Sequence, residues 1–344
     1  MEPNLRAPRR TRRTAGALPQ QLLLRSKTGT NSAKQRALLG FGEGLVSDLR
    51  QVLPPAHTGG PPSGLCLHSD DSLVHRGCVN GAAWNQSGTL LCTGSDDKRV
   101  KVWDAGRNFA LVDRGTIKTG HRHNIFHVSF VAAASDRQVL SCGADGTLWL
   151  SDMAASSDVE RGRLMCDQCE GMMFMFEWMP CIPVVLTAQE DGLVHRVDLR
   201  EPKPELAFAS SSRGAVKALA FGHHSEHILA MGGDGACVKL FDIRKLSCSA
   251  SPARAQVCSL VPEQLCVEGA AGRDDNVSIS GLAWSTDGRE LLASYHGDQI
   301  YAFDTWAPNH RGSVKAFGGH INHDTFLKGV TYFGEDHYVL SGSD

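Results

Sequence analysis

The sequence predicts an all-β fold of the propeller type, and three observations support this prediction. Short segments with alternating apolar and polar residues fill the body of the chain, tight-turn residues separate them, and an acidic residue after every third segment recurs with a near-constant period. The recurring residues are Asp104, Asp152, Asp198, Asp242 and Asp304, which lie 48, 46, 44 and 62 residues apart. Four-stranded units of this length are typical of propeller blades.

The amino-terminal segment differs sharply in charge from the rest of the chain. Residues 1–36 carry nine Lys and Arg side chains and one Glu, a charge of +8, which leaves −10 for the remainder because the whole chain has a formal net charge of −2. Residues 1–40 are also poor in aromatics, so we expect a disordered basic tail. Its arginine cluster, Arg9 to Arg13, is read as a nuclear import signal, an organellar transit signal or simply a solvated segment. We expect the protein in the nucleus and cytoplasm.

Residues 41–69 are expected to lead from this tail into the folded body. A short helix is predicted within Leu38–Leu53, and Pro54–Gly64 adds four prolines and three glycines, a composition typical of a linker. The propeller is assigned to residues 70–344.

The first unit shows how the repeat is built. Three predicted strands, Cys78–Trp84, Thr89–Thr93 and Val100–Trp103, are separated by turns at residues 86–88 and 96–98. Glycine-containing turn signals recur in step with the acidic residues, at residues 94–96, 143–146, 190–192, 233–235 and 297–298. Glycine supplies the positive φ that such hairpins require.

Two segments depart from the regular period. Ser247–Asp275 is rich in Ser, Ala, Pro and Gly, and it is predicted to hold the last strand of the fourth blade followed by a long surface loop, which either carries a binding site or is a tolerated insertion. Gly342-Ser343-Asp344 matches Gly94-Ser95-Asp96 of the first unit, so the chain is expected to stop within a sixth blade, at about five and a half of an expected seven. Such a chain is expected to be less stable than one with that blade completed, because sheet edges stay exposed.

Composition and motifs argue against several classes of function. The charge of −10 on the body gives no reason to expect specific nucleic-acid binding. The longest apolar stretch, Met172–Leu186, is interrupted by Glu177, Pro180 and Pro183, so no membrane span is expected. The sequence contains none of the usual nucleotide-binding, hydrolase or metalloprotease motifs, and we expect neither enzyme activity nor a cofactor.

The cysteine pattern favours reduced thiols over a metal site. The eleven cysteines are scattered from Cys66 to Cys266 without a secretory signal before them. Cys166 and Cys169 form a CxxC pair, with Cys181 and His195 as conceivable further zinc ligands. Because a zinc site usually needs a second close pair, buried thiols and no metal are predicted.

Histidines open several of the units, and with the acidic dipeptides they carry a family resemblance. A unit begins at a Gly-His corner, such as Gly120-His121 of the second unit, and ends at an acidic dipeptide, such as Trp103-Asp104 of the first. From about residue 70 to the carboxyl end, this pattern resembles the WD40 repeat. In that family a His, a Ser or Thr, an Asp and the Trp of one blade form a hydrogen-bonded structural tetrad. For the first blade the resemblance implies His75, Thr93, Trp103 and either Asp96 or Asp97, of which Asp96 is assigned.

Two consecutive units end in the same way. Val197-Asp198-Leu199-Arg200 and Phe241-Asp242-Ile243-Arg244 both follow a WDxR pattern, with Val197 and Phe241 in place of Trp. Each arginine follows the predicted third strand of its blade, so both are expected on one face. A guanidinium can donate paired hydrogen bonds to carboxylates or carbonyls of a partner. The alternative is an intramolecular pair with Asp198, Glu201 or Asp242.

Consecutive WDxR endings resemble the docking box of the DCAF proteins, the WD40 substrate receptors of cullin-4 RING ubiquitin ligases. Residues 188–201, 287–304, 319–322, 328–330 and 339–344 also resemble this subgroup, most closely its eighth member. The resemblance implies a non-catalytic receptor that docks on the ligase's damage-binding adaptor through Asp198, Arg200, Asp242 and Arg244, and presents an unidentified protein for ubiquitination. The alternative is a general WD40 scaffold in chromatin or signalling complexes.

Overall fold

The computed structural model describes the body of the chain. The described residues are 75–105, 111–134, 136–153, 162–201, 204–209, 214–222, 225–246, 252–265, 277–306, 315–323, 329–334 and 336–342. The expectations of a disordered tail in 1–40 and of a helix and linker in 41–69 fall outside them.

The described residues form five four-stranded antiparallel sheets and one two-stranded sheet. The first sheet holds β1 (Val79–Trp84), β2 (Leu90–Ser95), β3 (Arg99–Ala105) and β4 (Leu111–Lys118), and the second holds β5 (Ile125–Phe130), β6 (Gln138–Gly143), β7 (Leu148–Asp152) and β8 (Arg163–Cys166). The third holds β9 (Met173–Trp178), β10 (Val184–Gln189), β11 (Leu193–Asp198) and β12 (Glu205–Ala209), and the fourth holds β13 (Val216–Phe221), β14 (Ile228–Gly233), β15 (Val238–Asp242) and β16 (Gln256–Leu260). The fifth holds β17 (Ser278–Trp284), β18 (Glu290–His296), β19 (Ile300–Asp304) and β20 (Lys315–Phe317), and the sixth pairs β21 (Val330–Phe333) with β22 (Tyr338–Ser341).

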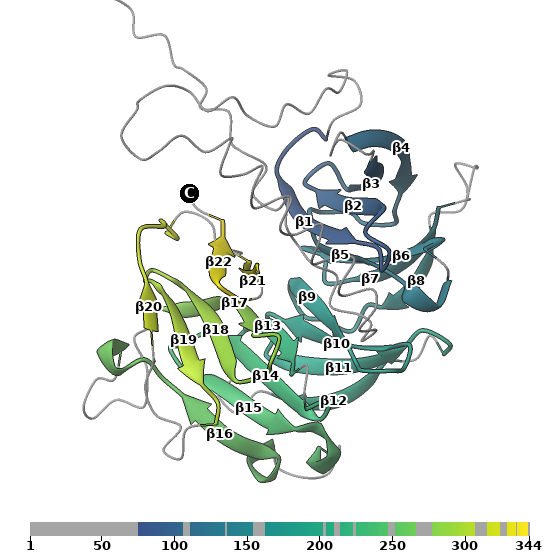
Figure 1. Cartoon of the computed structure of the whole chain (residues 1–344). Helices are drawn as coiled ribbons and strands as arrows, with labels where there is room; N and C mark the ends of the chain where they lie inside the picture. Colours follow the sequence, from purple (N-terminus) through teal and green to yellow (C-terminus); the bar gives the residue numbers. More distant parts are fainter. Residues whose placement is uncertain are drawn as a thin grey trace, which may run out of the picture.

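The sheets follow one another along an arc in chain order, with the first strand of each on the inside (Figure 1). These inner strands touch in sequence, β1 against β5, β5 against β9, β9 against β13, β13 against β17 and β17 against β21. The prediction of an all-β WD40 propeller is confirmed. Among the described residues, the helical structure is four short 3-10 turns, η1 (Ala132–Ala134), η2 (Ile243–Lys245), η3 (Pro252–Arg254) and η4 (Glu263–Leu265). None of the described helices has the length and apolar character needed to span a membrane.

The strand register explains the period seen in the sequence. Each recurring acidic residue lies at the end of a third strand, as its last residue or, for Asp104, the last but one. Each pairs with the first residue of the second strand: Asp104 with Leu90, Asp152 with Gln138, Asp198 with Val184, Asp242 with Ile228, and Asp304 with Glu290. Since the five sheets share this register and orientation, the five acidic residues lie at the same end of the blades. We call this end the aspartate face.

The core lies between neighbouring blades. Every residue of β2 and of β10 is buried, because the second strand of a blade is covered on both faces. Val197, which stands where the repeat has Trp, is fully buried between the second and third sheets with Val185 and Phe176. Burying one such side chain contributes about 1.5–3 kcal/mol, so inter-blade packing dominates the stability of the array.

The turns between second and third strands contain a left-handed residue. Gly146, Gly192 and Gly235 have φ of 70°, 77° and 89°. In the first sheet the sequence predicted the positive φ at Gly94, within the turn signal at residues 94–96. Gly94 lies within β2 instead, and the residue with a positive φ, of 65°, is Lys98. Its amide donates to the carbonyl of Ser95, as the Gly146 and Gly192 amides do to Gly143 and Gln189.

The long spacing before the fifth blade contains the predicted strand. β16 lies within Ser247–Asp275 and pairs with β15 as the outer strand of the fourth sheet. Residues 247–251 and 266–275 of the same segment lie outside the described residues.

Candidate docking surface on the aspartate face

Arg200 is held directly after β11 by the aspartate that ends the strand. The Arg200 backbone amide donates to Asp198 Oδ1 at 3.0 Å, and its side chain donates to the same carboxylate through Nε at 2.9 Å and Nη2 at 2.6 Å. The Asp198 side chain is 14% exposed and the Arg200 side chain is 67% exposed. A mostly buried carboxylate therefore anchors a guanidinium that faces solvent.

Arg244 repeats this geometry one blade further on, after β15. Its amide donates to Asp242 Oδ1 at 3.1 Å, and Nε and Nη2 donate to the two carboxylate oxygens at 3.0 and 2.9 Å. The exposed fractions of the Asp242 and Arg244 side chains are 6% and 64%. Of the alternatives that the sequence left open, the structure shows the intramolecular pairs with Asp198 and Asp242, and it shows both guanidinium groups accessible as well.

The pairing fixes the charge state of both sites. Hydrogen bonds from the Arg200 side chain lower the pKa of Asp198 to about 2, and those from Arg244 lower the pKa of Asp242 to about 2. Both carboxylates are therefore ionised at physiological pH. Each bidentate pair uses two of the five N–H donors of a guanidinium, so donors remain for a partner.

Guanidinium groups also approach the equivalent aspartates of the first and fifth sheets. Arg114 Nη1 lies 3.4 Å from Asp104 Oδ2, and Arg289 Nη2 lies 3.5 Å from Asp304 Oδ2. These arginines come from β4 and from the turn before β18, so their positions relative to the aspartate differ from the WDxR pattern. The sequence analysis missed them because a search for an arginine two residues after the aspartate cannot find a partner from another strand.

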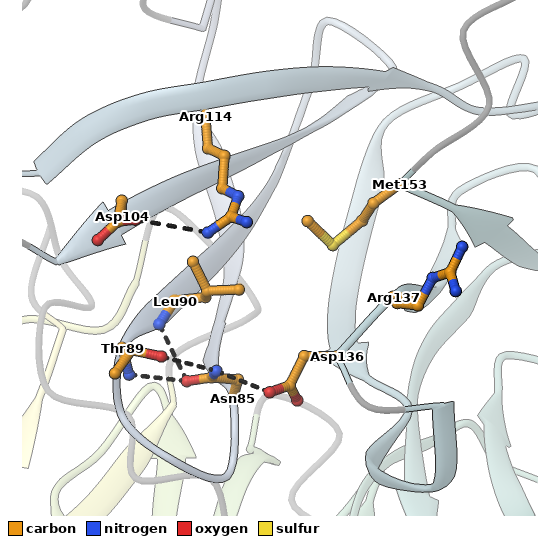
Figure 2. Close-up of a pocket in the computed structure, with 8 residues that line it drawn as sticks. All are labelled: Asn85, Thr89, Leu90, Asp104, Arg114, Asp136, Arg137 and Met153. Carbon is orange, nitrogen blue, oxygen red and sulfur yellow. Dashed lines mark hydrogen bonds and ion pairs between the residues drawn. The ribbon is translucent and has the colours of Figure 1, made fainter.

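A pocket of about 420 Å³ lies at the same end of the molecule, between the first and second sheets (Figure 2). Its lining residues are Asn85, Thr89, Leu90, Asp104, Arg114, Asp136, Arg137 and Met153. Asn85 Nδ2 donates to Asp136 Oδ2 at 2.9 Å across the two blades. Figure 2 shows the Arg114 guanidinium between Asp104 and the Met153 sulfur. The pocket is therefore part of the aspartate face.

The structural tetrad of the first blade lies at the opposite end and needs one correction. His75 Nε2 and Trp103 Nε1 both contact Thr93 Oγ1, at 2.8 and 2.9 Å, and His75 Nδ1 lies 2.9 Å from Asp97 Oδ2. The acid is thus Asp97 and not the assigned Asp96. Asp96 instead accepts from the Cys78 amide and from Asn80 Nδ2, which are groups of β1 and the residue before it.

The second blade builds a related network with different residues. His121 contacts Ser141 Oγ at 3.0 Å and Asp145 Oδ1 at 3.0 Å, as the sequence pattern would place them. The aromatic member is Trp149, which donates to Thr147 Oγ1 and meets the His121 ring edge-on at a centroid distance of 6.4 Å. Trp149 precedes the dipeptide position of Ser151 by two residues, so a search confined to the dipeptide misses it.

The four conceivable metal ligands are not brought together as a site. Over the described ranges, no group of three or more His, Cys, Asp or Glu side chains is arranged to hold a metal ion. His195 Nδ1 pairs with Gln189 Oε1 at 3.1 Å, and exposed Cys181 lies 3.9 Å from Glu226. Burial raises the pKa of Cys166, and it raises the pKa of Cys169 to about 12, so both remain thiols.

Comparison with known proteins agrees with the fold and finds several similar proteins. The sequence profile of the family "WD domain, G-beta repeat" matches residues 64–104. The human DDB1- and CUL4-associated factor 6 is 29% identical over 247 residues, covering 67% of this chain and 27% of that protein. The human WD and tetratricopeptide repeats protein 1 is 28% identical over 258 residues, or 67% of this chain and 37% of that protein. Protein ALTERED SEED GERMINATION 2 of Arabidopsis thaliana is 29% identical over 267 residues, or 66% and 34%.

The chain thus spans about a quarter to just over a third of the length of these relatives. The likeness to the eighth DCAF member stays a prediction. The chain therefore has a WD40 propeller fold with five four-stranded blades in a common register, matches the WD40 repeat over residues 64–104, and is similar to the human DDB1- and CUL4-associated factor 6.

Proposed function

We propose that this protein is a non-catalytic substrate receptor of a cullin-4 RING ubiquitin ligase, and that it docks on the ligase adaptor DDB1 through Arg200 and Arg244. The observation that carries the proposal is the repeated geometry in consecutive blades, where a buried carboxylate holds an exposed guanidinium by two hydrogen bonds. The similarity to a protein named for its association with DDB1 and CUL4 supports the same assignment.

The geometry suits recognition by directional hydrogen bonds. Each guanidinium is oriented before a partner arrives, so less side-chain entropy is lost on binding than for a free arginine. The Asp198–Arg200 and Asp242–Arg244 pairs are each close to neutral, which limits long-range attraction. Selectivity then comes from acceptor groups of the partner placed opposite the remaining N–H donors.

The receptor presents its target on another surface, and ubiquitin transfer is the task of the ligase. The target remains an unidentified protein, because propeller faces bind through side chains that follow no common motif.

Binding of purified DDB1 to Arg200→Ala, Arg244→Ala and the double variant tests the docking role. Loss of one well-placed interfacial guanidinium costs about 2–5 kcal/mol, so we expect affinity to fall by roughly 30- to 4,000-fold in each single variant and by at least as much in the double variant. Arg99→Ala is the matched control, since Arg99 is exposed at the opposite end of the first blade and should bind normally.

Two results would move the assignment elsewhere. Near-normal binding by a double variant with an unchanged circular dichroism spectrum would reject the docking role and favour a general WD40 scaffold. A double variant that fails to fold would show that these arginines serve the blade turns.

A further inference from the structure

The fifth blade carries a tryptophan at the position that Arg200 and Arg244 occupy in the third and fourth blades. Trp306 lies two residues after Asp304, the last residue of β19. Its backbone amide donates to Asp304 Oδ1 at 2.9 Å, which repeats the amide hydrogen bonds of Arg200 and Arg244 to their aspartates. Because the register of Asp304 matches that of Asp198 and Asp242, three consecutive blades present Arg, Arg and Trp from the same turn of the aspartate face.

The Trp306 side chain is largely exposed to solvent, so its apolar surface contributes little to the stability of the fold. At 69% exposure it is the most exposed of the large apolar side chains in the described part of the chain. The other tryptophans, Trp84, Trp103, Trp149, Trp178 and Trp284, are all buried or half-buried. An exposed indole leaves on the order of 100 Å² or more of apolar surface in water, which a partner can cover with a gain in free energy.

Exposed basic side chains also lie at the aspartate face of the fourth and fifth blades. Arg289 approaches Asp304 from the turn before β18, and its side chain is 59% exposed. Lys245, beside Arg244, is 61% exposed. The fifth blade therefore offers an exposed guanidinium beside its recurring aspartate, Asp304, and adds an aromatic group. Tryptophan and arginine are the residues most enriched among those that dominate the energy of protein interfaces.

We propose that Trp306 is an apolar anchor of the docking surface and inserts into an apolar socket on the adaptor, with backbone carbonyls or carboxylates around the socket accepting hydrogen bonds from Arg244 and Arg289. This inference rests on the proposed function and extends the surface from two blades to three. The backbone amide bond to Asp304 fixes where the side chain leaves the turn, so the anchor is positioned before binding.

The affinity of purified DDB1 for Trp306→Ala measures the anchor directly. We expect a loss of about 30-fold or more, because truncation of a central aromatic anchor typically costs at least about 2 kcal/mol. Ile321→Ala is the control: Ile321 is 54% exposed near the turn between β18 and β19, at the opposite end of the blade, and its variant should bind normally. Neither variant should change the melting temperature, since both side chains are mostly in solvent.

Acrylamide quenching gives a second readout that a merely structural role would not move. Adaptor binding should protect a fraction of the tryptophan fluorescence in the parent chain, and the Trp306→Phe variant should lack that protected fraction. Normal affinity of Trp306→Ala, together with weakened binding of Arg200→Ala and Arg244→Ala, would overturn the anchor and leave the proposed function intact. A parent chain that does not bind the adaptor would overturn both.

Discussion

At the scale of single residues, the site depends on the division of labour between an aspartate and the residue two positions later. The aspartate accepts the backbone hydrogen bond that closes the turn, and its side chain is mostly buried. The side chain two positions later faces the solvent. This arrangement makes Asp198 and Asp242 positioning residues for the arginines, and it ties their protonation to the presence of the guanidinium.

Removal of Arg200 should release the pKa of Asp198. In the folded chain this pKa is lowered to about 2 by the side-chain hydrogen bonds from Arg200, so in Arg200→Ala it should rise toward the ordinary value of 3.8. Because the folded pKa is the depressed one, the pair stabilises the fold above about pH 4, and that contribution is lost as the pH falls toward 2. A carboxyl NMR titration of the parent chain and Arg200→Ala would measure the change. An unaltered Asp198 titration in the variant would contradict the pairing, and Asp242, one blade away, serves as the internal control.

Residue identities were harder to predict than residue positions. The dipeptide period placed Arg200 and Arg244 correctly on one end of the blades, because strand register follows from the repeat. It could not decide between Asp96 and Asp97, which are adjacent in one turn and differ only in which one reaches His75. Trp306 was not singled out, since its position is meaningful only once the turn after Asp304 is seen to match the others.

At the scale of elements, the turns between second and third strands differ in how well their residues suit the backbone. Lys98 adopts a φ of 65° where the equivalent residues of the next two blades, Gly146 and Gly192, are glycines. A residue with a Cβ is strained by about 1–2 kcal/mol in this left-handed region, and glycine avoids that strain. Part of the advantage is offset, because glycine raises the conformational entropy of the unfolded chain.

The change Lys98→Gly should therefore stabilise the chain by about 0.5–1 kcal/mol. Urea denaturation monitored by circular dichroism would measure the difference. Lys98→Ala is the matched control, because it removes the lysine side chain but keeps the Cβ, and it should give no comparable gain. Equal stability of the Gly and Ala variants would show that the turn tolerates the left-handed residue without strain.

The inner second strands and the outer strand of the fourth blade were both predicted from the sequence. The second strands are buried on both faces and appear in the sequence as compact apolar runs, and the outer strand β16 was expected within an otherwise loop-like segment. The turn glycine of the first blade was misplaced because Gly94 belongs to a strand where a Cβ would meet Ile125 and Val128 within 2.7 Å. Gly94 is therefore required by close packing between the first two blades and not by a positive φ.

At the scale of the whole molecule, the two ends of the blades carry different kinds of side chain. The hydrogen-bonded networks of His75 and His121 lie at the turns between second and third strands, whereas the exposed arginines and Trp306 lie at the opposite end. Buried networks of this kind make their end rigid. The aspartate face can therefore vary its exposed side chains on a framework held from the other side.

Charge at the whole-molecule scale leads to a prediction about location. Residues 1–36 carry +8 and the rest of the chain −10, and we expect the basic segment to direct nuclear entry. A fluorescent reporter fused to residues 1–36 should accumulate in the nucleus, and replacement of Arg9, Arg10, Arg12 and Arg13 by Ala should abolish the accumulation. A cytosolic or organellar reporter would rule out the nuclear signal.

The turn that follows each third strand has a consequence for how such surfaces diverge. In the third, fourth and fifth blades it is closed by a backbone amide on an aspartate, a bond that any residue except proline can donate. The outward side chain two positions after the aspartate can therefore be exchanged by a single substitution while the backbone hydrogen bond that closes the turn is kept. The Arg, Arg and Trp of this chain form one of many combinations that the same turn can display.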